Sequence, residues 1–209
     1  MSALDDESIS LGILASHGGS NLQAIMDASE NGSLNANVVV VVSNNSRSMA
    51  LQRARNAGIP AFHLSSQTHS IGKDLDSAME HVLREYKVDL IILAGYMKQI
   101  GPSVLKAFHN RVLNSHPALL PKYGGKGMYG DHVHEAVVKD ESDESGITIH
   151  LVDQSYDTGA IIGQKIVTVD YLKGVDAVRN EIQKHEHNFW ITTLNKIQRG
   201  EIDLDKVGG

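Results

Sequence analysis

Short, continuously apolar runs are the feature that most constrains the fold of this chain. The clearest are VVVVV at 38–42 and LIILA at 90–94, and each has the length of one strand. A strand that is apolar on both faces must be covered on both faces, which is typical of a parallel sheet between two layers of helices. Both runs are too short to cross a bilayer, so they predict a buried sheet and no membrane span.

Segments with helical periodicity alternate with the apolar runs. In the clearest, 74–86, apolar residues recur every three or four positions, and the Lys, Asp, Glu and Arg side chains are expected on the outer face. We therefore predict an α/β protein: a single domain over 1–209 with one doubly wound, mostly parallel, Rossmann-like sheet. The expected strands are 10–16, 37–43, 61–64, 89–95, 111–117, 146–152 and 159–169, and the other expected helices carry Leu22 and Ile25 or span 47–57, 131–139 and 175–199.

Composition and charge exclude several classes of function. Of the 209 residues, 41% are hydrophobic and 21% are charged, as in globular proteins. The formal net charge is −6 and the basic residues are scattered, so general nucleic-acid binding is not expected. The chain has no cysteine, and its acidic amino-terminal segment lacks the features of a secretory signal. Both observations favour a cytoplasmic location.

A glycine pair follows the first expected strand. In SHGGSNLQAI, Gly18 and Gly19 precede Ser20 and Asn21 at the expected start of a helix. The amino-terminal N–H groups and the dipole of a helix favour an anion, and glycine lets a phosphate approach the backbone. The spacing is not that of a dinucleotide site or a P-loop. On this loop alone, a phosphate monoester site and a plain helix cap by Ser or Asn are equally consistent.

The stretch LNSHPALLPKY at 113–123 places an imidazole at the carboxyl end of an expected strand. Asn114 and His116 are two residues apart, so on an extended chain they share one face. Pro117 and Pro121 keep the segment from becoming helical. An amide beside an imidazole can donate to a developing oxyanion while the imidazole transfers a proton. A hydrogen-bonded structural histidine is an equally good interpretation of these residues alone.

Two other strand ends carry weaker signals. AGYMKQI at 94–100 ends an apolar strand, where open α/β sheets bind ligands, but a Met followed by a Lys at a strand end is more often ordinary packing with a solvated charge. In DQSYDTG at 153–159, Asp157 lies in a turn between two strands. A carboxylate near an imidazole raises the pKa of the histidine, although spacing alone favours a turn-forming aspartate.

Eleven histidines raise the possibility of a metal site. The pairs His132/His134 and His185/His187 fall in expected helices, where an i, i+2 spacing directs the two side chains to different faces. We therefore predict no metal. The chain also has neither a GxSxG motif nor a cysteine, so a covalent nucleophile is not expected.

Five segments together resemble the folate-dependent formyltransferases over about residues 9–200. The Asn-x-His-Pro-x-Leu-Leu-Pro motif with a downstream Asp-x-Gly is specific for that superfamily, and the Gly-Ser-Asn loop indicates its glycinamide ribonucleotide branch. GGKGMYG followed by HEAV resembles the monofunctional eukaryotic form. The five segments are GSNLQAI (19–25), SNN (43–45), LAGYM (93–97), LNSHPALLPKY (113–123) and HLVDQSYDTGAII (150–162).

The resemblance implies transfer of a formyl group from 10-formyltetrahydrofolate to the amine of 5-phosphoribosylglycinamide in de novo purine biosynthesis, without a metal. It implies a tetrahedral intermediate, with Asn114 as oxyanion donor, His116 as proton shuttle and Asp157 keeping His116 protonated. The implied contacts to the substrate are Gly19, Ser20, Asn21 and Glu186, and those to the formyl donor are Met97, Lys98, Gln99, Ile100, Asn114, Asp153 and Asp157.

The chain departs from the family pattern near the tail of the folate. Lys98 replaces the usual Arg after Met, which keeps the charge but loses the planar fork of the guanidinium. An arginine that some members place near the glutamate of the folate aligns with Gly72. Lys73 or His69 is the expected replacement.

Related enzymes are alternatives: a formyltetrahydrofolate hydrolase, which usually has an extra amino-terminal domain, or a methionyl-tRNA formyltransferase, which has a basic carboxyl-terminal domain. A third alternative is a non-catalytic module that binds a nucleotide with the loop 19–21 alone. Neither extra domain is recognisable in the sequence, and the acidic charge argues against tRNA. We expect small-molecule partners, no nucleic acid or membrane, and a monomer or weak homodimer.

Overall fold

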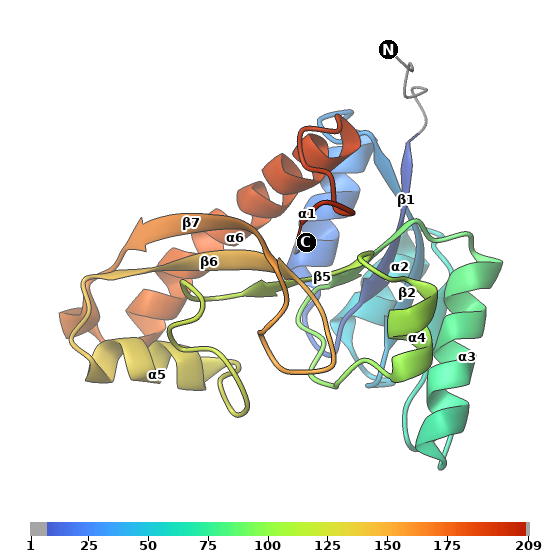
Figure 1. Ribbon diagram of the computed structural model, residues 1–209, viewed down its shortest axis with the longest axis horizontal. Coiled ribbons are helices and arrows are strands. Elements are labelled where there is room, and N and C mark those ends of the chain that lie inside the picture. The colour runs from blue at the N-terminus through green and yellow to red at the C-terminus, as the bar shows by residue number, and fades with distance from the viewer. Residues whose placement is uncertain (1–7, 208–209) are drawn as a thin grey trace.

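The computed structural model describes residues 8–207 (Figure 1). The acidic segment 1–7, which contributed to the expectation of a cytoplasmic location, lies outside the described residues. The strands are β1 (Ile9–Leu14), β2 (Ala36–Ser43), β3 (Ala61–His63), β4 (Leu90–Leu93), β5 (Val112–His116), β6 (Glu144–Leu151) and β7 (Ile161–Thr168). The helices are α1 (Ser20–Glu30), α2 (Met49–Asn56), α3 (Gly72–Glu85), α4 (Pro102–Ala107), α5 (Asp131–Lys139) and α6 (Val175–Gln198), with a short 3-10 helix η1 (Tyr171–Lys173) before α6.

All seven strands of the described residues form one sheet in the order β3-β2-β1-β4-β5-β6-β7. Strands β1 to β5 pair in parallel, and β6 and β7 pair antiparallel. The predicted doubly wound, mostly parallel α/β fold is confirmed. The strand order reverses between β1 and β4, which makes their carboxyl ends the topological switch point where such sheets bind ligands.

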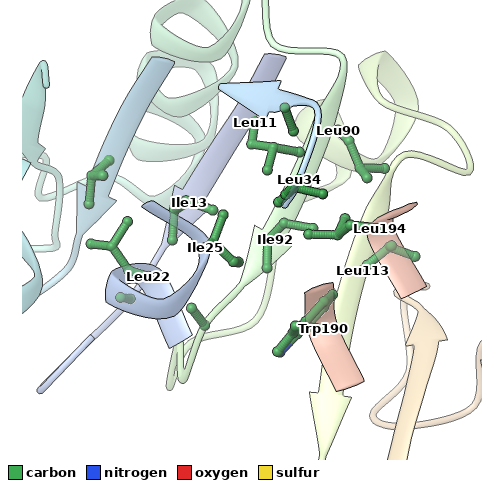
Figure 2. Close-up of a cluster of buried hydrophobic side chains, with 14 of the residues drawn as sticks. Leu11, Ile13, Leu22, Ile25, Leu34, Leu90, Ile92, Leu113, Trp190 and Leu194 are labelled. Carbon is green, nitrogen blue, oxygen red and sulfur yellow. The ribbon is translucent and has the colours of Figure 1, made fainter. Parts of the chain in front are cut away.

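The two faces of the sheet bury two different sets of helices. Along β4, Leu90 and Ile92 point into one core with helices α1, α2 and α6, whereas Ile91 and Leu93 point into another with α3 and α4. Figure 2 shows the first core, in which Trp190 of α6 lies beside Leu113 of β5. Strands apolar on both faces therefore mark the covered sheet, as predicted from the sequence.

Strands β6 and β7 form a hairpin at one edge of the sheet, with α5 and part of α6 alongside (Figure 1). A third core joins these elements: Val137 of α5 and Val178 and Ile182 of α6 pack with Ile147 and Val167 of the hairpin. This core packs the hairpin against α5 and α6, while the pairing of β5 with β6 sets where the hairpin lies relative to the end of β5.

Helix α4 was not predicted from the sequence, because a six-residue helix has too few turns to give a periodic signal. A side chain from α3 caps it: Asp76 accepts hydrogen bonds from the N–H groups of Ser103 (2.7 Å) and Val104 (3.3 Å). Asp76 is only 9% exposed, so the expectation that the acidic residues of 74–86 all lie on the outer face is wrong at this position. Its carboxylate satisfies amides that would otherwise lack a partner.

Replacing Asp76 with alanine is expected to lower the free energy of unfolding by about 1–3 kcal/mol, because the partly buried amide of Ser103 and the buried amide of Val104 lose their acceptor. Urea denaturation of the purified protein measures this change. Asp74→Ala is the control: Asp74 is an exposed acidic residue in the first turn of the same helix, and its loss should cost less than about 0.5 kcal/mol. Equal effects of the two substitutions would contradict the capping role of Asp76.

Within residues 8–207, no helix is both long enough and apolar enough to span a membrane.

Candidate active site

Asn114 and His116 lie at the carboxyl end of β5, on one face of the strand, as their spacing predicted. Asn114 pairs with His150 of β6 and His116 pairs with Thr148 in the antiparallel register. Asn114 is half-buried, whereas His116 is only 3% exposed. The sheet register therefore brings a second histidine, His150, to the site.

Asp157 lies between the two imidazoles. Its Oδ2 is 3.6 Å from Nδ1 of His116, and its Oδ1 is 3.6 Å from Nε2 of His150. These distances are longer than direct hydrogen bonds, and they allow a strong charge interaction when an imidazole becomes protonated. Oδ2 also accepts the N–H of Gly125 at 2.9 Å. The structure thus brings together Asn114, His116 and Asp157, whose proximity the sequence could not show.

The turn that presents Asp157 explains the Asp-x-Gly spacing. Asp157 has a left-handed backbone (φ 58°), which Asp tolerates better than most residues. Two residues on, a Cβ at Gly159 would lie 1.8 Å from the carbonyl oxygen of Leu151, so only glycine fits there. Both residues are needed to turn the chain from β6 into β7 with the carboxylate facing β5.

Burial lowers the pKa of His116 below its usual value of 6.5. The Asp157 carboxylate and a hydrogen bond to the carbonyl of Tyr123 raise this pKa, but by less than burial and the neighbouring His150 together lower it. The contribution of Asp157 has the predicted direction, but burial, which local sequence patterns do not show, moves the net pKa of His116 the other way. Nε2 lies 2.7 Å from the Tyr123 oxygen and donates to it, so in the neutral ring Nδ1 is the basic atom and faces Asp157.

His150 is the site residue that the sequence reasoning missed. Its Nδ1 lies 2.8 Å from the carbonyl oxygen of Leu151 and donates to it, which leaves Nε2 as an acceptor for Nδ2 of Asn114 at 3.2 Å. Burial lowers the pKa of His150 and favours this neutral form. His150 thereby orients the Asn114 amide. The sequence feature that could have identified His150 is its position near the end of the expected strand 146–152, seven residues before Asp157.

The loop before α1 has the geometry of an anion site. Gly19 takes a left-handed conformation (φ 68°) and occupies the N-cap position without any side-chain capping bond. The interpretation as a plain Ser or Asn cap is therefore wrong, and the first amides of α1 have no side-chain acceptor. Asn21 is 7% exposed, and its Oδ1 has no hydrogen-bond partner within the described residues. Ser20 is exposed beside it.

Helix α2 holds this loop in place. The N–H of Ala50 donates to His17 O at 3.1 Å, and the Arg53 guanidinium donates to Gly18 O and to Gln23 Oε1, both at 2.9 Å. Gly19 packs closely against Ala50, where a Cβ would lie 2.9 Å from the Ala50 Cα. The cationic guanidinium also adds positive charge beside the open amides of α1.

The segment Met97–Ile100 follows β4 and crosses the same edge of the sheet. The N–H of Met97 donates to Ser16 Oγ at 2.8 Å, which ties this segment to the end of β1. Gln99 Nε2 donates to Gln154 O at 2.7 Å, which ties it to the loop that carries Asp157. Lys98 is exposed, and Ile100 is buried in the core under α3 and α4.

Asp153 stabilises its own loop. Its Oδ1 accepts the N–H of Ser155 at 2.8 Å, and both carboxylate oxygens accept the Thr158 hydroxyl at 2.9 Å. A contact between the Asp153 side chain and the formyl donor stays a prediction. Its observed bonds shape the turn that positions Asp157.

A cleft of about 670 Å³ opens on the side of α3. The side chains of Arg47 and Lys98 give its lining positive charge, and His17 and Gly72 also border it. Neither Lys73 nor His69, the expected replacements for the family arginine, lines this cleft. Arg47 is therefore the additional cation that the structure offers here.

Glu186 lies on the other face of the sheet, on α6, which packs against α1 (Figure 1). It is half-buried, and its Oε1 accepts the hydroxyl of Ser115 at 2.6 Å. The glycine loop and Glu186 thus lie on the face of the sheet that α1 and α6 cover. The segment Met97–Ile100 and the cleft lie on the face that α3 and α4 cover. Asn114 and His116 lie between the two.

The histidine pairs considered for a metal site lie in α5 and α6, as predicted. Across residues 8–207, no group of three or more His, Asp or Glu side chains is arranged to hold a metal ion.

A family model and the sequences of related proteins place this chain in the same family. The formyl transferase family model matches residues 11–194. Phosphoribosylglycinamide formyltransferase of Haemophilus influenzae is 32% identical over 194 residues, which cover 93% of this chain and 89% of that protein. The chloroplastic protein of the same name from Vigna unguiculata is 38% identical over 199 residues, which cover 95% of this chain but 64% of the plant protein. The chain therefore spans less than two thirds of that relative.

The fold comparison agrees. The crystal structure of glycinamide ribonucleotide transformylase 1 from Symbiobacterium toebii superposes with a TM-score of 0.86 at 34% identity, covering 92% of this chain and 89% of that one. The match of the family model extends from β1 to α6 and includes Asn114, His116 and Asp157. The chain belongs to the formyl transferase family.

Proposed function

We propose that this protein transfers the formyl group of 10-formyltetrahydrofolate to the amine of 5-phosphoribosylglycinamide, a step of de novo purine biosynthesis. The observation that carries the proposal is the convergence of Asn114, His116 and Asp157 at the end of β5. These side chains lie between an open helix amino terminus on one face and a cation-lined cleft on the other. The named relatives support the same reaction.

The acceptor is proposed to bind on the α1/α6 face. Its phosphate would accept hydrogen bonds from the uncapped amides at Gly19, Ser20 and Asn21, with Arg53 adding positive charge. Glu186 would accept hydrogen bonds from the amine or the ribose. This arrangement directs the amine toward Asn114 and His116.

The formyl donor is proposed to bind between Met97–Ile100 and the loop of Asp153 and Asp157. The link from Gln99 to Gln154 holds these two segments together. The carboxylates at the tail of the donor would meet Lys98 and Arg47 in the cleft. The aligned family arginine is absent at Gly72, so these two cations would take its place.

Attack of the amine on the formyl carbon forms a C–N bond and places negative charge on the formyl oxygen. The amide of Asn114, with one N–H held by His150, has its second N–H available to stabilise that oxygen. His150 accepts one N–H of Asn114 and so sets which way the side-chain amide points. The second N–H of Asn114 is therefore oriented before the substrate binds.

His116 is proposed to move the proton. Its lowered pKa leaves the ring neutral at neutral pH, so Nδ1 can accept a proton from the attacking nitrogen. The resulting imidazolium is stabilised by Asp157, 3.6 Å away. Nδ1 then gives the proton to N10 of the folate as the C–N10 bond breaks, which returns His116 to its neutral form.

Steady-state turnover tests the proposal. Purified protein with both substrates, in the presence of a chelator, should produce tetrahydrofolate at a rate that depends on the ribonucleotide. Donor consumption that is independent of the ribonucleotide would indicate a hydrolase instead. Ribonucleotide binding without donor binding would indicate the nucleotide-binding module.

We further propose that the protein acts without a metal, on small molecules, as a monomer or weak homodimer. A cytoplasmic location stays a prediction, and relatives from three plants carry a chloroplastic name.

A further inference from the structure

A chain of hydrogen bonds runs from the core to Glu186. Trp190 Nε1 donates to Ser115 Oγ at 3.2 Å, and the Ser115 hydroxyl donates to Glu186 Oε1 at 2.6 Å. Glu186 and Trp190 are four residues apart on α6, so they face the same side of the helix. Ser115 lies between Asn114 and His116, and strand alternation places its side chain on the opposite face of β5, toward α6.

The direction of this chain is fixed by the chemistry of its members. An indole N–H can only donate, so Ser115 Oγ must accept from Trp190 and has its own proton left for Glu186. Trp190 is fully buried in the core shown in Figure 2, so the donor at the start of the chain cannot turn away. The 2.6 Å distance is that of a charge-assisted O–H···O⁻ bond.

We propose that Ser115 is a positioning residue for the acceptor substrate. It holds Oε1 of Glu186 and leaves Oε2 to accept a hydrogen bond from the amine or ribose of the acceptor. The two faces of β5 then serve the two halves of one reaction, with Asn114 and His116 directed at the formyl group and Ser115 supporting the carboxylate. This inference rests on the proposed function, because it assigns Glu186 to the acceptor.

Ser115→Ala is expected to raise KM for the ribonucleotide roughly 10-fold, the scale of a lost hydrogen bond to a charged group. KM for the formyl donor should not change, because the donor binds on the other face. The dissociation constant of the ribonucleotide alone, measured by calorimetry, should rise by the same factor. A change in both KM values, or in neither, would overturn the proposal.

A double-mutant cycle separates positioning from general packing. If Ser115 acts through Glu186, the effect of Ser115→Ala should disappear in a Glu186→Ala background, which removes the acceptor of the Ser115 hydroxyl. Additive effects would overturn the proposal. Ser145→Ala is the matched control, because Ser145 is 2% exposed on β6 and its hydroxyl has no hydrogen-bond partner within the described residues. This control should leave both KM values unchanged.

Failure of the role proposed for Ser115 can be distinguished from failure of the proposed function. If the unaltered protein shows no formyl transfer, the proposed function fails. If it transfers the formyl group but Ser115→Ala behaves as the unaltered protein, only the role of Ser115 is wrong.

Discussion

Replacing His116 with alanine is expected to lower kcat for formyl transfer by about 10²- to 10⁴-fold. The variant lacks the imidazole that is proposed to take the proton from the attacking amine and return it to N10. The measurement is steady-state turnover with both substrates saturating, together with the affinity for the ribonucleotide. That affinity should be retained, since the phosphate and Glu186 contacts lie on other elements.

His81→Ala is the control for this substitution. His81 is an exposed histidine on α3 (80% exposed side chain), and its loss should leave kcat unchanged. Full activity of the His116→Ala variant, with the control also active, would contradict the role of His116.

Replacing Asp157 with asparagine is expected to lower kcat about 10²-fold or more and to move the pH profile. The free enzyme needs neutral His116 as its base, so kcat/KM falls as this group becomes protonated. Because the pKa of His116 is lowered by burial, this acid limb should lie below pH 6.5. Asp157 raises that pKa, so its removal should shift the limb to still lower pH. The pH dependence of kcat/KM measures the shift.

Asparagine is the suitable replacement because it tolerates the left-handed backbone at 157 and keeps an oxygen for the N–H of Gly125. Asp143→Asn, at an exposed carboxylate in the turn before β6, should change neither kcat nor the pH profile. An acid limb that stays in place, or moves to higher pH, would contradict the interaction between Asp157 and His116.

Much of the fold could be predicted because its strands are buried on both faces. VVVVV and LIILA each form one strand of the parallel sheet, and helix α5 begins and ends at the predicted residues. Helix α4 could not be predicted in the same way, since it depends on a carboxylate that α3 supplies. The same contact explains why Asp76 is buried on a helix whose acidic residues were all expected outside.

The candidate site was predictable in its residues but not in its environment. The spacing of Asn114 and His116 placed them on one face, and the turn between two expected strands singled out Asp157. A resemblance to known enzymes assigned Asp157 its role and added Glu186. The 3.6 Å distance to Asp157 depends on the conformation of the β6–β7 loop, which Gln99 and Gly125 hold by hydrogen bonds from distant parts of the chain. The net direction of the His116 pKa depends on burial, and the position of His150 depends on the register of β6. These are tertiary properties that local sequence patterns do not contain.

The most direct test of the central claim follows the formyl group itself. The donor is prepared with an isotopically labelled formyl carbon and mixed with the ribonucleotide and excess protein, and the ribonucleotide is analysed by mass spectrometry after a single turnover. We expect the label on the amine of the ribonucleotide with the unaltered protein, and transfer slowed by at least ~10²-fold with His116→Ala. Labelled formate with an unlabelled ribonucleotide, or equally fast transfer by both proteins, would contradict the assignment of formyl transfer to Asn114, His116 and Asp157.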